Sequence, residues 1–231
     1  MLRAYFFANE VFKMKFSTKK LATLAMLAAA AYMLVFFIRI PIVAILPFLK
    51  YEPKDVAVTI GGFLFGPLSS FLISLVVSLV EMVTISDTGP IGGLMNLLST
   101  CSFACTAALI YKKKRSLTGA ILGLTAGTIA MCCVMLLWNW LITPIYMGYP
   151  RDAVAAMLVP VFLPFNLLKA GLNSAFVLFL YKPLVTALRK TGLVETREQV
   201  ASSGNKMGAS LLGILLLATC ILLLLVFQGK I

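Results

Sequence analysis

The stretch VAVTIGGFLFGPLSSFLISLVVSLVEMV, residues 56–83, decides what kind of protein this chain can be. It is predominantly apolar over a length that is typical of membrane-spanning helices. The segment GGFLFGP (Gly61–Pro67) interrupts it, and Pro67 suits the first turn of a new helix, where its missing N–H costs nothing. The stretch therefore predicts two short membrane helices, over about Asp55–Phe65 and Pro67–Val83.

The composition of the whole chain agrees with a membrane location. Of the 231 residues, 61% are hydrophobic and only 12% are charged, and the mean hydropathy is +1.02. A soluble domain carries about 25% charged residues. Because a spanning helix with its connection takes roughly 30 residues, the chain has room for six or seven spans and for no catalytic domain outside the membrane.

Further spans are predicted from the other apolar runs. They cover Thr18–Ile38, Leu94–Tyr111, Leu117–Tyr146, Val161–Leu184 and Ala209–Phe227. A long, partly apolar loop is expected at Arg39–Pro53, whose interior prolines end the preceding helix, and turns are expected at Ser86–Gly93 and Met147–Asp152. The predicted fold class is an all-α integral membrane protein.

The chain is expected to divide into four parts. Residues 1–13 carry no motif, and Met14 is itself a plausible start, so we interpret them as an extension. Residues 14–194 form the six-helix membrane domain, residues 195–208 a cytoplasmic linker, and residues 209–228 an additional C-terminal transmembrane helix. The last helix holds no charge or amide within Ala209–Phe227, so we expect it to face lipid.

The basic residues predict the orientation in a cell membrane. If the spans alternate from a cytoplasmic N-terminus, 14 of the 20 Lys and Arg residues fall inside, among them the run KKKR at Lys112–Arg115, and five fall outside. The remaining one, Lys169, lies within a span. This asymmetry follows the positive-inside rule, so it accounts for the net charge of +12 without a nucleic-acid partner.

Several kinds of chemistry are excluded or disfavoured. The absence of histidine removes His-based triads, His-ligated zinc and His proton relays. All five cysteines lie in apolar runs, where free Cys packs as a small hydrophobe. The sequence has no phosphate-binding G-x-x-x-x-G-K-[ST] loop, and we see no pair of membrane carboxylates. We therefore expect no enzyme activity, no metal and no cofactor, and an energy source outside this chain.

Lys169 is the strongest candidate for a functional residue. It lies within an apolar span, where a charge costs at least a few kcal/mol unless it meets water, a partner or a ligand. Asn166 and Asn173 stand three residues before and four residues after it and so share its helix face. A purely structural network is the alternative, because Asn can form hydrogen bonds between membrane helices. An ammonium between two amides favours a ligand site.

Polar residues elsewhere at the predicted outer side extend this candidate site. Asn139 stands between two tryptophans that an interfacial aromatic belt explains, whereas the belt does not explain the amide. Asn96 lies at a comparable level of its own span. The loop residues Lys50, Tyr51 and Glu52, with the nearby Asp55, are rich in donors and acceptors, although ordinary solvation also explains such a group.

The first span holds a pattern of small residues. Ala25 and Ala29 stand four residues apart, a spacing that allows two membrane helices to approach closely. The pattern serves either internal packing or the docking of another membrane subunit.

Together these features resemble the substrate-binding S components of energy-coupling factor (ECF) vitamin transporters, most closely the riboflavin-specific member. The likeness covers about Met14–Glu195 and starts with the alanine-rich first helix. It also rests on LKYEPKDVAVTIGGFLFGP (Leu49–Pro67), on NWLITPIYMG (Asn139–Gly148) and on PFNLLKAGLN (Pro164–Asn173). The predicted C-terminal span departs from the six helices that are usual for S components.

The resemblance implies a six-helix membrane protein that binds riboflavin from outside. Its implied partners are a membrane scaffold subunit and two ATPase subunits, which supply the energy. The scaffold-docking positions of the family would map to Ala25 and Ala29. Its flavin-binding residues would map to Asn139, Asn166 and Lys169, and its lid to the loop with Lys50, Tyr51 and Glu52.

The chemistry of these residues agrees with a flavin but also admits other ligands. The pyrimidine edge of an isoalloxazine ring offers carbonyl acceptors beside an N–H donor, which a carboxamide and an ammonium match. The same groups would recognise another flat heterocyclic vitamin or a nucleobase-like ligand, which is the alternative within transport. A membrane enzyme or assembly protein is disfavoured, because no nucleophile with a matched base is present.

Overall fold

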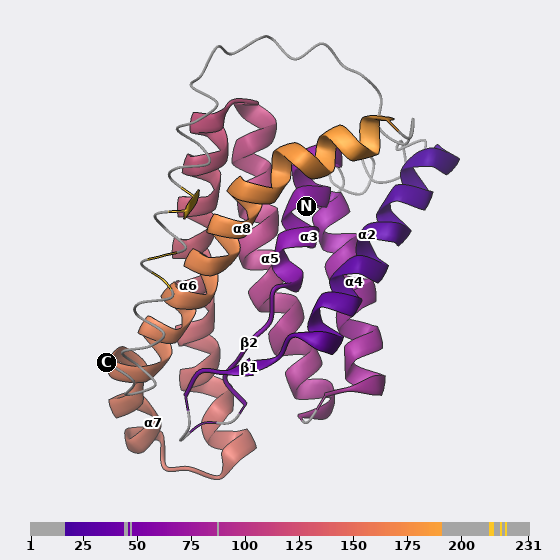
Figure 1. Ribbon diagram of the computed structural model, residues 1–231. Coiled ribbons are helices and arrows are strands. Elements are labelled where there is room, and N and C mark those ends of the chain that lie inside the picture. The colour runs from indigo at the N-terminus through magenta and orange to yellow at the C-terminus, as the bar shows by residue number, and fades with distance from the viewer. Residues whose placement is uncertain are drawn as a thin grey trace, which may run out of the picture.

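The computed structural model describes residues 17–43, 46, 48–86, 88–190, 213–214, 218 and 220. Its long helices are α2 (Thr18–Phe37), α3 (Lys54–Phe65), α4 (Pro67–Thr84), α5 (Gly89–Lys113), α6 (Leu117–Met147) and α8 (Leu163–Lys190). A short helix α7 (Arg151–Met157) leads through the π-helical turn η1 (Leu158–Phe162) into α8, and two short antiparallel strands, β1 (Ile40–Pro41) and β2 (Lys50–Tyr51), follow α2 (Figure 1). The predicted all-helical membrane fold is confirmed.

Several helices begin at local signals that the sequence carries. Ser17 precedes α2 and accepts a hydrogen bond from the backbone N–H of Lys20, which would otherwise lack a partner. Ser116 does the same at the start of α6. Between α3 and α4, Gly66 adopts a φ of 96°, which an L side chain would disfavour, and Pro67 opens the next helix. The predicted break at GGFLFGP is therefore confirmed.

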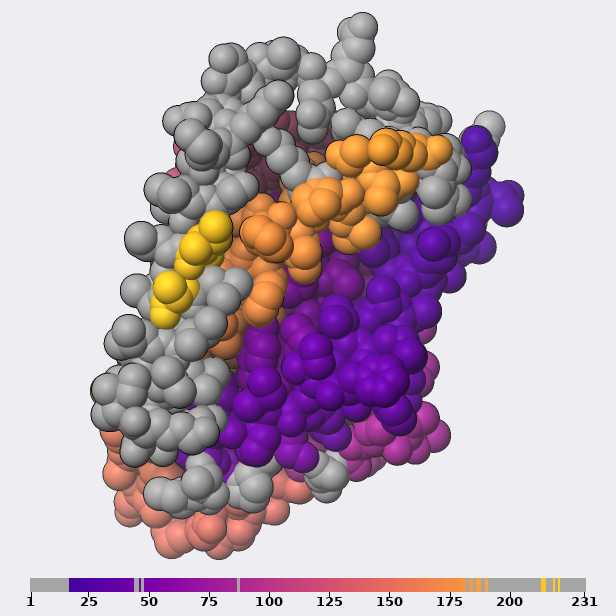
Figure 2. Space-filling view, viewed as in Figure 1, coloured from indigo at the N-terminus to yellow at the C-terminus, as the bar shows by residue number. Residues whose placement is uncertain are grey.

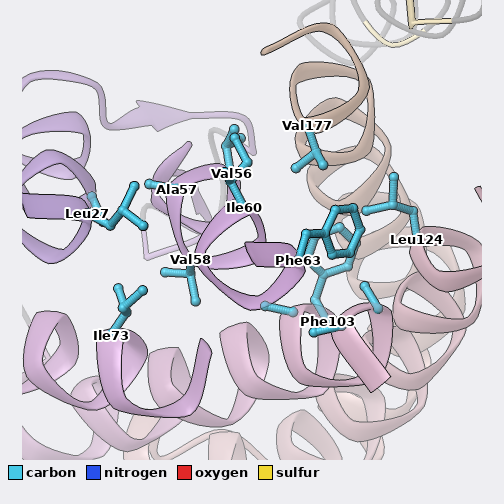
Figure 3. Close-up of a cluster of buried hydrophobic side chains, with 14 of the residues drawn as sticks. Leu27, Val56, Ala57, Val58, Ile60, Phe63, Ile73, Phe103, Leu124 and Val177 are labelled. Carbon is cyan, nitrogen blue, oxygen red and sulfur yellow. The ribbon is translucent and has the colours of Figure 1, made fainter. Parts of the chain in front are cut away.

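Helix α3 lies in the centre of the bundle. Its 12 residues extend about 18 Å, too short to cross a hydrocarbon core of about 30 Å. Every residue of Lys54–Phe63 is buried. Figure 3 shows α3 among apolar side chains of other helices, of which Leu27, Ile73, Phe103, Leu124 and Val177 are labelled. A helix that is apolar on all sides is stable only in such surroundings.

The other helices form the membrane-crossing shell. In the described part of the chain, five helical stretches are long and apolar enough to cross a membrane: α2, α4, α5, α6 and the run Arg151–Tyr181. The chain is therefore a multi-pass membrane protein. Figure 1 shows the β1–β2 loop, the α4–α5 turn and α7 gathered at one end of the bundle, which we call the loop end. In Figure 2 the violet atoms of the β1–β2 loop lie at the surface, next to the salmon atoms of α7.

Helices α5 and α6 pack with their backbones in close contact. Gly123 and Gly127 of α6 face the backbone of α5: an added Cβ would lie 2.6 Å from the carbonyl oxygen of Ala107 and 2.5 Å from that of Phe103. Together with Gly119 they form a stripe at every fourth residue, which we call the α6 glycine stripe. Only residues without a side chain allow this approach.

Two predicted boundaries were wrong, and one local feature was not predicted. Helix α5 begins at Gly89 and not at Leu94, because Pro90 fits the first helical turn, so much of the predicted turn is helical. The predicted span Val161–Leu184 is the middle of a longer run that starts at Arg151 and includes the π-helical turn. The sequence reading also missed the β1–β2 pairing, since strands of two residues are too short for an alternating pattern.

Other predicted parts lie largely outside the described residues. These are the extension (residues 1–13) and the linker (residues 195–208). Of the predicted C-terminal span, four residues are described, and each is helical: Gly213, Ile214, Ala218 and Cys220. Cys220 is buried in an apolar cluster that also contains Leu46 and Tyr51.

Candidate ligand-binding site

A cavity lies at the loop end of the bundle, between the β1–β2 loop and helices α4, α5, α6 and α8. Six of the residues predicted to bind a ligand line it: Lys50, Glu52, Asn96, Asn139, Asn166 and Lys169. Tyr51 and Asn173, which were also predicted, do not belong to its lining. The cavity encloses about 50 Å³, whereas an engineered cavity of about 150 Å³ holds benzene. Even a ligand of one aromatic ring therefore has to displace part of the wall.

One wall of the cavity carries the amide and ammonium groups of α6 and α8, Asn139, Asn166 and Lys169, and we call it the amide wall. All three side chains are buried. The Asn139 Nδ2 atom donates to the Met135 carbonyl at 2.7 Å, and its Oδ1 accepts from Thr143 at 2.8 Å. Lys169 is only 4% exposed, yet within the described part of the chain its Nζ makes no hydrogen bond or ion pair. A buried ammonium of this kind is costly without an acceptor.

The π-helical turn places the α8 part of this wall. Pro160 lies within the turn and Pro164 is the second residue of α8, and neither can donate the backbone hydrogen bond of a regular helix. Asn166 donates its amide to the carbonyl of Phe162 at 2.7 Å, at the end of the turn. Such turns are frequent at functional sites because they change the direction of the following side chains.

A buried cluster of charges, which we call the acid wall, supplies Arg39, Glu52 and Glu81 to another part of the cavity lining. Lys54 Nζ binds Glu81 Oε2 and lies 3.3 Å from Glu52 Oε2. Arg39 binds the other oxygen of Glu52 at 3.1 Å and also donates to the backbone carbonyl of Ile85 at 2.7 Å. Asn96 donates to Glu81 Oε2 at 3.0 Å.

Sequence reasoning missed most of the acid wall. Arg39 and Lys54 were counted as outer-loop charges, but Lys54 is buried and Arg39 is partly buried. Glu81 was passed over as part of an apolar span. The signal that would have found it is the one used for Lys169, an ionisable residue inside a membrane span.

The environment keeps Glu52 ionised. Burial by itself would raise the pKa of its carboxyl, but the positive charges of Lys54, Lys169 and Arg39 outweigh that effect, so the pKa lies below the ordinary value. Solvation, the alternative explanation for the loop charges, is wrong for Glu52, Tyr51 and Asp55, since all three are buried.

A hydrogen-bonded network behind the cavity joins its walls. Asp55 accepts from Thr100 at 2.6 Å and from Asn173 at 3.0 Å, and Asn173 in turn accepts from the Tyr51 hydroxyl at 3.2 Å. Burial and the nearby Asp55 raise the pKa of Tyr51, so it stays a neutral donor. Asn173 thus connects the loop, α3, α5 and α8, and both its amide atoms are engaged.

The two predicted docking alanines lie away from the cavity. Ala25 and Ala29 are exposed on the outer face of α2, whereas the neighbouring Ala28 and Ala31 are buried against the bundle. Their face is not used for packing within the described part of the chain.

Comparisons with known proteins show which family this chain resembles. The model of a family described as "ECF transporter, substrate-specific component" matches residues 19–181. Riboflavin transporter RibU of Staphylococcus aureus (strain TCH60) is 33% identical over 178 residues, which cover 74% of this chain and 93% of that protein. Riboflavin transporter FmnP of Bacillus subtilis (strain 168) is 27% identical over 160 residues, covering 65% of this chain and 84% of that protein.

A solved structure agrees in fold. It is described as "Structure and mechanism of the S component of a bacterial ECF transporter", superimposes with a TM-score of 0.64 at 33% identity, and covers 74% of this chain and 98% of that chain. The similar proteins are transporters and not enzymes. With a central buried helix, a cavity at the loop end and a family model that spans residues 19–181, this chain belongs to the substrate-specific components of ECF transporters.

Proposed function

We propose that this chain is the subunit that captures riboflavin from outside the cell and delivers it inward together with an ECF module. The names of the similar proteins from Staphylococcus aureus and Bacillus subtilis support riboflavin as the ligand. The module consists of a membrane scaffold subunit and two ATPase subunits. In this arrangement the N-terminus is cytoplasmic and the loop end faces outward.

The observation that carries the proposal is the buried ammonium of Lys169 beside two buried amides in one cavity wall. The ring carbonyls of a flavin would supply the acceptors that Lys169 lacks within the described residues, and Asn139 and Asn166 would complete the contact with the pyrimidine edge. The apolar part of the ring would lie against the cavity residues Met135, Phe48 and Phe165.

Two of the predicted ligand residues take a different part in this proposal. Tyr51 donates directly to Asn173 and so holds the β1–β2 loop to α8, while Asn173 donates to Asp55 of α3. In this proposal neither Tyr51 nor Asn173 touches the ligand. Lys50 and Glu52 lie on the same loop and line the cavity. Since the cavity is too small for a tricyclic ring, the loop would shift when the ligand enters.

Ala25 and Ala29 are proposed to contact the scaffold. They leave a shallow, exposed surface along α2 on which another membrane helix can pack closely. Residues 14–194 form the substrate-binding domain in this proposal, and the helix at residues 209–228 is an addition to the six-helix plan.

The test uses the purified full chain in detergent. A flavin that copurifies would give an absorption band in the visible range, and after its removal added riboflavin should lose fluorescence on binding in a saturable way. Thiamine and a nucleobase serve as competitors. If neither competitor displaces riboflavin, the result supports the assignment. If the chain binds one of the competitors but not riboflavin, the assignment is overturned.

A further inference from the structure

Glu81 on α4 is a buried acid with one unused oxygen. Its Oε2 atom binds Lys54 and accepts from Asn96. Its Oε1 atom is buried and, among the described residues, accepts no hydrogen bond. The side chain is only 2% exposed and forms part of the cavity lining. A buried carboxylate oxygen without a donor is costly, so a donor that enters the cavity would be stabilised there.

The surrounding charges indicate what kind of donor fits. The positive charges of Arg39, Lys54 and Lys169 act among the negative charges of Glu52, Glu81 and Asp55. Three charges of each sign leave no net charge that a charged ligand would neutralise. A phosphate or carboxylate placed beside Glu81 would meet two negative side chains. Neutral hydroxyls can donate to the free oxygen of Glu81, and hydrogen bonds to an ionised acceptor are about twice as strong as those between neutral groups.

The two walls of the cavity therefore differ in chemistry. The amide wall on α6 and α8 offers the donor groups of Lys169 and two amides, whereas the acid wall on α4, α5 and the loop offers acceptors. A ligand with a flat acceptor-rich ring at one end and a chain of hydroxyls at the other matches both walls in one orientation.

We propose that Glu81 is a specificity-determining residue that accepts a hydrogen bond from a hydroxyl group on the side chain of the transported ligand. The inference rests on the proposed function and deepens it. The ring lies on the amide wall, and the hydroxylated chain extends to Glu81 and Asn96. A ligand without hydroxyls leaves the Glu81 oxygen unpaired and binds more weakly, because a site built to bind a hydroxyl discriminates against the analogue that lacks it.

The experiment compares riboflavin with lumiflavin, which has the same ring but a methyl group in place of the ribityl chain. Affinities are measured for the unmodified chain, Glu81→Gln and Glu81→Asp. In Glu81→Gln the affinity for riboflavin should fall at least tenfold, while that for lumiflavin should change less than twofold. Glu81→Asp keeps the negative charge on a side chain that is one methylene shorter. Its affinity for riboflavin should therefore fall less than that of Glu81→Gln, and its affinity for lumiflavin should again change little. Asp152→Asn removes an exposed acid on α7 and should affect neither ligand.

The outcomes separate this inference from the proposed function. Equal losses for both flavins in Glu81→Gln would show a merely structural role, and no loss would remove Glu81 from the site. Failure of the unmodified chain to bind any flavin would refute the proposed function instead. If the Glu81 variants do not fold, a flavin with an N-pentyl chain tests the unmodified chain. Binding as tight as that of riboflavin would overturn the inference, and binding at least tenfold weaker would support it.

Discussion

The molecule contains two stripes of small residues with the same four-residue spacing but different surroundings. The α6 glycine stripe is buried, and two of its glycines, Gly123 and Gly127, meet the backbone of α5 at distances that no side chain tolerates. The second stripe, Ala25 and Ala29 on α2, is exposed. In sequence both are small-xxx-small patterns that permit close helix contact. The structure distinguishes them: the glycine stripe packs against another helix, whereas the alanine pair packs against no helix among the described residues.

In the proposed function, the buried stripe holds the fold together and the exposed stripe contacts a partner. Helices α5 and α6 pack with their backbones in contact. Helix α5 supplies Asn96 and helix α6 supplies Asn139 to the cavity lining. Helix α2 contributes no residue of its own to the cavity lining, although Arg39 follows it directly. The proposed docking on α2 and the proposed ligand binding at the loop end therefore use separate surfaces, and variants should affect them separately.

The largest effect is expected from filling the buried stripe. In Gly127→Leu the new side chain collides with the carbonyl of Phe103, so α5 and α6 have to move apart, and the free energy of unfolding should fall by about 3 kcal/mol or more. Thermal unfolding in detergent and the yield of monodisperse protein measure this. Cys133→Leu, at an exposed position of α6, is the matched control and should be close to neutral. Equal stability of the two variants would show that α6 tolerates separation from α5.

Filling the exposed stripe should leave the folded protein intact and stop transport. Ala29→Trp or Ala25→Trp places a bulky side chain where the scaffold helix would approach, so uptake driven by ATP should be lost while riboflavin affinity stays within about twofold. Uptake by cells that also produce the ECF module, together with binding to the purified chain, measures both. Ile129→Trp changes an exposed residue of α6 and should preserve uptake. Loss of binding in the alanine variants would mean that the stripe serves internal packing.

Variants in the cavity should have the reverse effect, namely weaker riboflavin binding with scaffold docking preserved. Lys169→Met or Asn166→Ala should each weaken riboflavin binding by at least about 1 kcal/mol, because a ligand acceptor loses its donor in a buried site. Copurification of the variants with the scaffold subunit should persist, since the α2 face is unchanged. Titration by fluorescence quenching gives the affinity. Unchanged affinity in both variants would remove these residues from the site.

The sequence alone could predict those features whose signal is local. The break between α3 and α4 was predictable because Gly66 and Pro67 act locally. Lys169 and Asn166 were predictable because a polar group inside an apolar span carries a known cost. In each case the signal lies within a few residues of the feature, so it does not depend on how distant segments meet.

The rest depended on contacts between distant segments. Lys54 and Glu81 stand 27 residues apart and Asp55 and Asn173 stand 118 apart, so neither pair has a local pattern. Glu81 lies near the end of an otherwise apolar span, where an acid is easily explained by a position at the membrane–water interface. The α6 glycine stripe was equally ambiguous, because glycine is frequent in membrane helices and only the position of α5 shows what the stripe contacts.

The smallest effect is expected from removing the predicted C-terminal helix. A chain that ends at Ser203 keeps both small-residue stripes and both cavity walls, so it should fold, bind riboflavin and support uptake. The shortened chain loses Cys220, which is buried in the apolar cluster with Leu46 and Tyr51 of the loop. If the helix has a peripheral role, the loop should lose only a few tenths of a kcal/mol of stabilisation, and riboflavin affinity should change by at most about twofold. Binding and uptake are measured in parallel on the shortened and the full chain. If the shortened chain binds flavin normally but does not transport it, the scaffold must contact residues beyond Ser203, and the exposed alanine stripe is not a sufficient docking surface.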